Sequence, residues 1–163
     1  MMNTKEILEM GEQYLMRNVG RIPLAPVRGK GVQLWDADGN EYLDFVSGIA
    51  VNSLGHCHPA VVDAITRQAN KLIHCSNLYY IEPQVLLAKM LAKHSGMSKA
   101  FFCNSGAEAN EAAIKLARKH AKLKYSQEKI EIITAQQSFH GRTLATITAT
   151  GQTRYQKGFE PLP

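Results

Sequence analysis

Two short segments of this sequence carry groups that could bind an anionic ligand. Ser105, Gly106 and Ala107 place a hydroxyl and a glycine where a helix is predicted to begin, and the unpaired backbone N–H groups of a helix start bind phosphate readily. Further along the chain, Phe139 offers a flat ring and Arg142 offers a guanidinium, whose paired N–H groups match a carboxylate. Together these groups suit a flat phosphorylated cofactor and a substrate that carries a carboxylate.

Ser105 also has a purely structural interpretation. With Glu108 it fits a capping box, in which the serine hydroxyl and the glutamate carboxylate satisfy backbone donors at the helix start. Small apolar residues then recur at helical spacing, and basic residues gather toward the end, where they complement the helix dipole. Capping boxes are common, so Ser105 alone leaves an ordinary helix cap and an anion site equally open.

The segments on either side of this helix are predicted to be strands. Residues 99–103 contain adjacent aromatic residues, and residues 130–135 are rich in β-branched side chains. A strand, a helix and a second strand form a βαβ unit, whose strands are parallel and whose crossover is right-handed. Because the carboxyl ends of parallel strands lie at one edge of a sheet, residues 105–107 and 139–142 are predicted to converge on one crevice.

The first part of the chain is predicted to contain a helix and a β-hairpin. Residues 3–17 are amphipathic and begin with Asn3 and Glu6, which fit a second capping box. Prolines favour an extended linker over residues 21–26. An Asp-Gly pair in the middle of residues 32–45 predicts a hairpin, whose role is interpreted as structural.

The middle of the chain is predicted to be helical, and its end is predicted to be a loop. Apolar residues recur at helical spacing over residues 59–72 and 82–94. Residues 151–163 contain glycines and prolines without periodicity, which favours a loop. His56 and His58 flank a cysteine, but no further ligand cluster accompanies them, so no metal site is predicted.

Composition excludes several classes of function. The chain has 163 residues and a net charge of +5, but its basic residues are scattered without interleaved aromatic residues, so nucleic-acid binding is not expected. Three cysteines form neither a metal motif nor an even disulfide framework, which favours a reducing, cytoplasmic environment. Neither a basic-then-apolar leader nor a long apolar run is found, so membrane insertion is not expected.

Beyond these local patterns, the sequence resembles the class III (ω-type) aminotransferases over nearly its whole length. The segments that carry the resemblance are residues 29–45, 48–51, 54–59, 104–110 and 138–143. The family uses pyridoxal phosphate (PLP) and has fold type I, so the resemblance implies an α/β fold of that type. It also implies a helix for residues 143–150, although their β-branched side chains favour a strand.

The resemblance further implies a domain division and a reaction. Residues 1–58 would form the helix, linker and hairpin of the small domain. Residues 59–163 would form the first part of the large cofactor-binding domain, with an incomplete, mostly parallel sheet. The intact enzyme would be a homodimer with its active site at the subunit interface. It would transfer the terminal amine of N-acetylornithine, or of a similar ω-amino acid, to 2-oxoglutarate in arginine biosynthesis.

Roles for individual residues follow from the same resemblance. Ser105, Gly106 and Ala107 would hold the cofactor phosphate, Phe139 would stack on the pyridine ring, and Arg142 would bind the substrate α-carboxylate. Family members often carry threonine in place of Ala107, which implies a weaker phosphate site in this chain. No catalytic residue is assigned here, because the Schiff-base lysine of the family is expected beyond residue 163, and residues 1–163 alone are expected to be inactive.

Two residues and two other function classes stay open. Tyr80 matches a loop that borders the substrate channel of the family, and His140 follows Phe139; each is a ligand contact or a structural neighbour. A sugar-phosphate-binding domain would also use the Ser-Gly turn, but it leaves Phe139 and Arg142 without a role. A non-catalytic folding or dimerisation module is the stronger rival, because this chain has no lysine in a suitable context.

Overall fold

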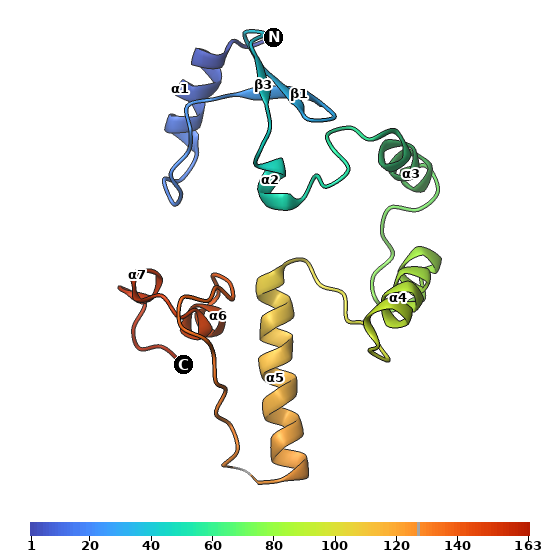
Figure 1. The fold of residues 1–163 in the computed structure, drawn as a ribbon, viewed down its shortest axis with the longest axis vertical. Coiled ribbons are helices and arrows are strands. Elements are labelled where there is room, and N and C mark those ends of the chain that lie inside the picture. Colours follow the sequence, from blue (N-terminus) through green and yellow to red (C-terminus); the bar gives the residue numbers. More distant parts are fainter. Residues whose placement is uncertain (127) are drawn as a thin grey trace. The chain divides into compact units, whose positions relative to one another are not determined.

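The structure is a computed structural model that describes residues 1–126 and 128–163. The chain folds into two compact units, Met1–Tyr79 and Tyr80–Pro163, and Figure 1 labels most of their elements. A compact unit is defined by its own internal contacts, which do not locate the domain boundary of a family. The division after residue 58 that the resemblance implies therefore stays a prediction.

The first unit opens with helix α1, Thr4–Tyr14. Its start has the expected capping box: the Asn3 side-chain oxygen accepts from the Glu6 N–H at 2.9 Å, and the Glu6 carboxylate accepts from the Asn3 N–H at 3.0 Å. The predicted helix is confirmed at its start. It is shorter than residues 3–17, because the backbone is already extended at Leu15.

An antiparallel sheet with the strand order β1-β2-β3 follows in the same unit. Its strands are β1 (Pro26–Lys30), β2 (Gln33–Asp36) and β3 (Glu41–Leu43). Leu34 in the central strand pairs with Gly29 and with Tyr42. The predicted hairpin is thereby confirmed. Strand β1 was missed because it begins with a proline at the end of the predicted linker, a position that edge strands tolerate.

The hairpin turn is organised around the carboxylate of Asp36, which is only 4% exposed. It accepts hydrogen bonds from the Asn40 backbone at 2.8 Å, the Asn40 amide at 2.9 Å, the Asp38 backbone at 3.0 Å and the Tyr42 hydroxyl at 2.9 Å. The hydrogen bond from the Asn40 side chain is the largest cause that lowers the pKa of Asp36. Gly39 completes the turn with a φ of +88°, which glycine adopts without strain.

Two helical segments complete the first unit. They are α2 (Ser47–Ala50) and α3 (Pro59–Ala69). Helix α3 confirms the predicted helix and begins with Pro59. Proline is tolerated at this position, because an N–H at the start of a helix has no acceptor within the helix. Segment α2 is not a regular helix, because Ser47, Gly48, Ile49 and Ala50 all have φ between 51° and 61°, a region that non-glycine residues rarely adopt.

The second unit is built mainly from helices. They are α4 (Glu82–Ser95), α5 (Gly106–Lys124), α6 (Leu144–Ala149) and α7 (Thr153–Gln156). Helix α4 confirms the prediction and ends at Gly96, whose φ of +73° is typical of a helix terminator. Helix α6 agrees with the family pattern rather than with strand propensity. The prediction of a loop over residues 151–163 is wrong at α7, whose single turn is too short to show periodicity.

The two strands predicted around α5 are not formed, so this prediction is wrong. Residues 99–103 and 130–135 pair with no strand among the described residues, and the one parallel contact nearby is a single bridge between Gln136 and Gly151. A strand requires backbone partners on a neighbouring strand, which local sequence cannot supply. The side chains here lack cover as well, since Phe101 is 70% exposed and Ile133 is 98% exposed.

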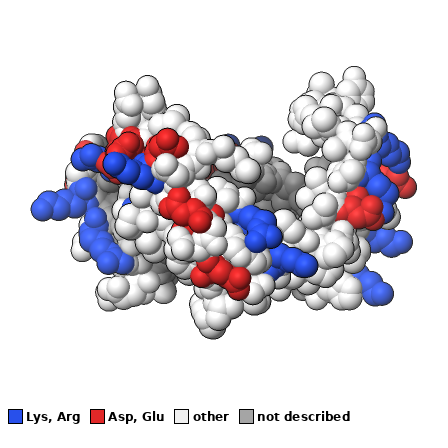
Figure 2. Space-filling view, turned by 90° about the horizontal axis from the view of Figure 1, so that it is seen from above, with Lys and Arg blue, Asp and Glu red and all other residues white. Residues whose placement is uncertain are grey.

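On the face shown in Figure 2, acidic side chains lie among the basic ones, so the net charge of +5 does not form one continuous basic surface there. Of the helices that the structure describes, none is both long and apolar enough to cross a membrane.

Candidate active site

The first half of the candidate site is the start of helix α5. Ser105 is the residue that caps the helix, and its hydroxyl oxygen accepts from the Glu108 N–H at 3.1 Å. The Glu108 carboxylate reaches the backbone N–H of Asn104 at 2.6 Å instead of that of Ser105. The predicted bond from the Glu108 N–H to the Ser105 hydroxyl is therefore confirmed. The predicted return bond to the Glu108 carboxylate is formed by the N–H of Asn104, one residue before the predicted donor.

The same helix start keeps backbone donors available to a ligand. The N–H groups of Gly106 and Ala107 belong to the first turn, where no carbonyl of the helix itself can accept them. Neither group has another acceptor among the described residues. A Cβ placed on Gly106 would meet no atom within 4 Å, so the space beside these donors is open. The cap and the anion site, posed above as alternatives, are compatible.

The second half of the site is the loop of residues 138–142, which lies against the start of α5. The Asn110 amide on α5 donates to the His140 carbonyl oxygen at 2.7 Å. Gly141 is so close to Ala107 that a Cβ on Gly141 would lie 2.8 Å from the Cβ of Ala107. The predicted convergence of the two segments is confirmed, although the strands that were expected to bring them together are not formed.

Buried threonines hold this loop in place. Thr146 and Thr150 are fully buried on and just after α6. The Thr146 hydroxyl accepts from the Thr143 N–H at 3.0 Å, and the Thr150 hydroxyl accepts from the His140 N–H at 3.0 Å. These hydroxyls thereby accept from one backbone donor in the loop and from one at the start of α6. The threonine-rich segment therefore forms a helix whose side chains shape the loop, which its strand propensity did not indicate.

Phe139 and Arg142 lie together with a third residue that sequence reasoning missed, Tyr155 on α7. The Arg142 guanidinium carbon is 4.3 Å from the centroid of the Tyr155 ring and 5.3 Å from that of Phe139. The two rings meet edge to face at 6.2 Å. No acidic side chain that the structure describes forms an ion pair with Arg142, so its N–H groups remain available to a carboxylate.

Tyr80 and His140, whose roles the sequence leaves open, lie in different surroundings. Tyr80 is 99% exposed at the first residue of the second unit. The His140 ring nitrogen Nδ1 is 3.4 Å from the Ser138 hydroxyl, while its backbone is fixed from both sides as described above. Contact of either residue with a ligand stays a prediction.

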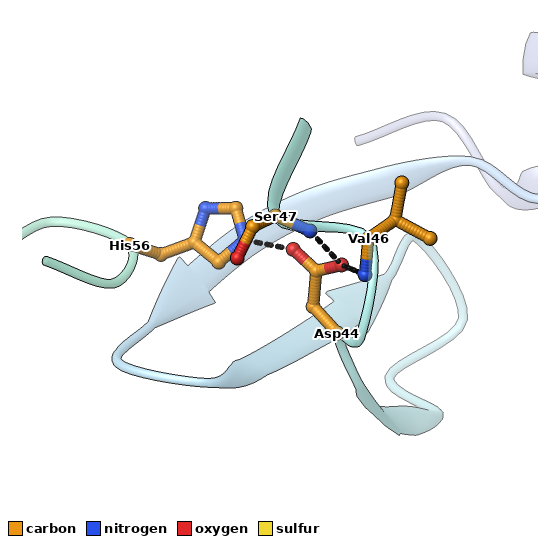
Figure 3. A network of polar contacts seen from close by, with 4 residues as sticks. All are labelled: Asp44, Val46, Ser47 and His56. Carbon is orange, nitrogen blue, oxygen red and sulfur yellow. Dashed lines mark hydrogen bonds and ion pairs between the residues drawn. The ribbon is translucent and has the colours of Figure 1, made fainter. Parts of the chain in front are cut away.

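A different polar cluster lies in the first unit, and Figure 3 shows it. The Asp44 carboxylate accepts from the backbone of Val46 and Ser47 at 2.9 Å each, and it lies 2.6 Å from Nε2 of His56. These hydrogen bonds, with that to His56 the largest cause, lower the pKa of Asp44. Across the described residues, no group of three or more side chains is arranged to hold a metal ion.

Comparison with known proteins identifies the family. The family model for class-III aminotransferases matches residues 14–163. The chain belongs to the class-III aminotransferases. A relative named acetylornithine aminotransferase, from Caldanaerobacter subterraneus subsp. tengcongensis, is 61% identical over 151 residues, which cover 93% of this chain and 38% of the relative.

Solved structures of aminotransferases share the fold. An (S)-enantioselective omega-transaminase from Thermomicrobium roseum covers 100% of this chain with a TM-score of 0.91 at 30% identity, over 39% of its own length. Taurine:2-oxoglutarate aminotransferase from Bifidobacterium kashiwanohense, solved in complex with PLP and glutamate, covers 96% at a TM-score of 0.85 and 30% identity, over 35% of its length. The predicted fold type I is thereby confirmed, and the chain spans less than half the length of these proteins.

Proposed function

We propose that the protein to which these residues belong is a PLP-dependent acetylornithine aminotransferase. It would transfer the terminal amine of N-acetylornithine to 2-oxoglutarate, giving the semialdehyde and glutamate, as a step of arginine biosynthesis. The 61% identity to a relative of that name supports the substrate. The observation that carries the proposal is the Arg142 guanidinium, which lies beside an exposed aromatic ring without an acidic partner among the described residues.

The residues present fit PLP. Ser105, Gly106 and Ala107 would hold the phosphate, because the two free N–H groups and the open space beside Gly106 suit a bulky anion. Phe139 would stack on the pyridine ring, since 57% of its surface is exposed. When bound, PLP supplies an electron sink for the carbon whose bonds change. The Ala107 methyl group adds no hydroxyl donor, so the phosphate would depend on Ser105 and the backbone.

Arg142 would select and orient the amino-acid substrate. A guanidinium binds a carboxylate through two parallel hydrogen bonds, which fix direction as well as distance. Holding the α-carboxylate of N-acetylornithine in this way leaves its amine at the opposite end of an extended chain. The residue therefore acts by positioning the substrate, and it holds no proton that the reaction transfers.

We also propose that the enzyme is a cytoplasmic homodimer with its active site at the subunit interface. Apolar side chains that residues 1–163 leave exposed, among them Phe45 at 93%, Ile49 at 87% and Leu78 at 83%, would be covered by the remainder of the protein or by a partner subunit. The three cysteines are free, as suits a reducing compartment. A non-catalytic module would have the same exposed side chains, but it would give Arg142 and Phe139 no function.

Activity of a full-length chain that carries these residues tests the proposal. The expected result is PLP-dependent formation of glutamate from 2-oxoglutarate with N-acetylornithine as donor, together with a visible absorbance band of the bound cofactor. No glutamate from N-acetylornithine, despite activity with another ω-amino acid, would overturn the substrate. No cofactor binding at all would overturn the enzyme and favour the non-catalytic module.

A further inference from the structure

The Arg142 side chain is held by an aromatic ring that the function proposed above does not use. Its guanidinium carbon lies 4.3 Å from the Tyr155 centroid, closer than the 5.3 Å to Phe139. The Tyr155 ring in turn meets Phe139 edge to face, with an interplanar angle of 80°. Tyr155 therefore contacts both side chains that are proposed to face the ligands.

Helix α7, which carries Tyr155, is tied to both neighbouring segments. The Gln156 amide donates to the carbonyl oxygens of Thr150 at 3.0 Å and Thr148 at 3.2 Å, near the end of α6. The Gln152 amide donates to the Ser138 carbonyl oxygen at 3.0 Å, at the start of the loop that carries Phe139 and Arg142. The turn that carries Tyr155 is thereby tied on both sides to the segments that flank Arg142.

Within the part of the chain that the structure describes, the N–H groups of the Arg142 guanidinium form no ion pair and remain available to a carboxylate. Stacking on an aromatic ring uses the flat face of a guanidinium, whereas a carboxylate binds to its N–H groups in the plane. The two contacts do not compete. An arginine without such a contact samples many rotamers, and that freedom is lost when a substrate binds. A ring that restricts Arg142 beforehand reduces this loss.

We propose that Tyr155 is a positioning residue, whose ring holds the Arg142 guanidinium ready for the carboxylate of the amino-acid substrate. This inference rests on the proposed function, because it requires that Arg142 bind a carboxylate. It assigns the ring of Tyr155, and not its hydroxyl, as the active part. It concerns substrate affinity rather than the rate of the chemical step.

Arg154 also contacts this ring, with its guanidinium carbon 4.6 Å from the centroid. Its guanidinium donates to the Gln152 side-chain oxygen at 3.0 Å, which holds it on α7. A second cation next to Arg142 makes the surroundings more positive and favours an incoming carboxylate. The Arg154→Ala variant removes this charge while keeping the ring, so it separates the electrostatic effect from stacking.

The test compares two amines in the full-length, PLP-loaded enzyme. N-acetylornithine carries the α-carboxylate, and N-acetylputrescine is the same molecule without it. In Tyr155→Leu, KM for N-acetylornithine is expected to rise about three- to tenfold, the range of a cation–π contact, while kcat changes less than about twofold. KM for N-acetylputrescine is expected to stay at its wild-type value. Tyr155→Phe keeps the ring and is expected to behave as wild type.

Two controls exclude a general loss of structure. Tyr125 also lies under a cation, with Nζ of Lys129 4.7 Å from its centroid, but at the far end of α5, so Tyr125→Leu is expected to leave both KM values unchanged. The double variant Arg142→Ala/Tyr155→Leu is expected to be no worse than Arg142→Ala alone, because the ring acts through Arg142.

The possible failures are distinguishable. If Arg142→Ala raises KM for N-acetylornithine and Tyr155→Leu does not, only the inference on Tyr155 is overturned. If Tyr155→Leu weakens both amines equally, the residue is merely structural and the inference is also overturned. If Arg142→Ala leaves KM for N-acetylornithine unchanged, the carboxylate role of Arg142 and this inference fall together, whereas the proposed activity is overturned only if the wild-type enzyme forms no glutamate from N-acetylornithine.

Discussion

Two clusters of this chain, one around Asp44 and one around Arg142, differ in whether the charged group already has hydrogen-bonding partners within the chain. The Asp44 carboxylate is satisfied from within by Val46, Ser47 and His56, and its side chain is only 8% exposed. The Arg142 guanidinium is held by ring faces and has no acidic partner in the parts of the chain that the structure describes. Both residues lie in segments that resemble the family, and both are charged.

The difference separates a structural cluster from a binding site. A carboxylate that accepts hydrogen bonds from two backbone N–H groups and a histidine has little left to offer a ligand, and it stabilises the loop that supplies those donors. A guanidinium without a carboxylate has unused donors, which a substrate can satisfy. Asp44 and Arg142 are both charged, but only Arg142 keeps hydrogen-bonding groups that a ligand could satisfy.

The largest effect is expected at Arg142. In the full-length enzyme, Arg142→Ala should raise KM for N-acetylornithine about a hundredfold, because a charge-assisted bidentate pair contributes about 1.5–3 kcal/mol. PLP affinity should change far less, as titration of the apoenzyme with PLP would show. Arg142→Lys keeps the positive charge but not the paired N–H groups, so it should recover only part of the lost affinity for N-acetylornithine. Equal loss of substrate and cofactor affinity would contradict the carboxylate role.

The next effect is expected at Gly141, where the loop meets α5. A Cβ there would lie 2.6 Å from the Thr146 hydroxyl and 2.8 Å from the Ala107 Cβ, at a φ of +138°. Gly141→Ala should therefore lower the free energy of unfolding by about 1–3 kcal/mol and raise KM for N-acetylornithine, as measured by urea unfolding and steady-state kinetics. At Gly20, with no atom within 4 Å, the same substitution should be neutral. Equal results at both positions would mean that the loop and helix do not meet as described.

A smaller effect is expected at Phe139, on the cofactor side of the site. Phe139→Ala should weaken PLP binding about tenfold, the upper range for a stacked aromatic pair, as followed by loss of the cofactor absorbance during dialysis. Phe159 provides a matched control, since it is 55% exposed against 57% for Phe139, and Phe159→Ala should retain PLP as the wild type does. Wild-type retention in Phe139→Ala would remove this ring from the stacking role.

The smallest effect on activity is expected at Asp44, because its cluster is closed. Asp44→Asn should leave KM for N-acetylornithine unchanged and lower the urea midpoint at neutral pH. The folded carboxyl has a lowered pKa, so its stabilisation is present above the unfolded value of about 3.9 and is lost as pH falls through the lower folded pKa. The loss of stability in acid should therefore be smaller in Asp44→Asn than in wild type. Asp63 is an exposed acid paired with Arg67, and Asp63→Asn should change neither KM for N-acetylornithine nor the urea midpoint. A raised KM in Asp44→Asn would contradict the distinction between the two clusters.

Local signals predicted much of the fold. The capping residues Asn3 and Ser105 located two helix starts, and the Asp-Gly pair located the hairpin, because each depends on neighbours along the chain. Residues 99–103 and 130–135 were wrongly predicted as strands, because a strand depends on partners that lie elsewhere. The family pattern corrected the propensity of residues 143–150, where buried hydroxyls rather than β-branching decide the structure.

The candidate site was predicted in its main residues and missed in its supporting ones. Ser105 and Arg142 stand out by type and spacing, but Asn110 and Tyr155 act through contacts across the fold, at 2.7 Å to the His140 carbonyl and 4.3 Å to the Arg142 guanidinium. An aromatic residue in a segment without periodicity carries no sign of which side chain it will contact. The contact between Tyr155 and Arg142 is seen only in the folded structure.

A crystal structure of the full-length enzyme with PLP and N-acetylornithine would test the central claim most directly. Phosphate oxygens are expected within hydrogen-bond distance of the Gly106 and Ala107 N–H groups, and the substrate α-carboxylate is expected to pair with Arg142. A phosphate bound elsewhere, or Arg142 paired with an acidic side chain of the enzyme itself, would contradict it.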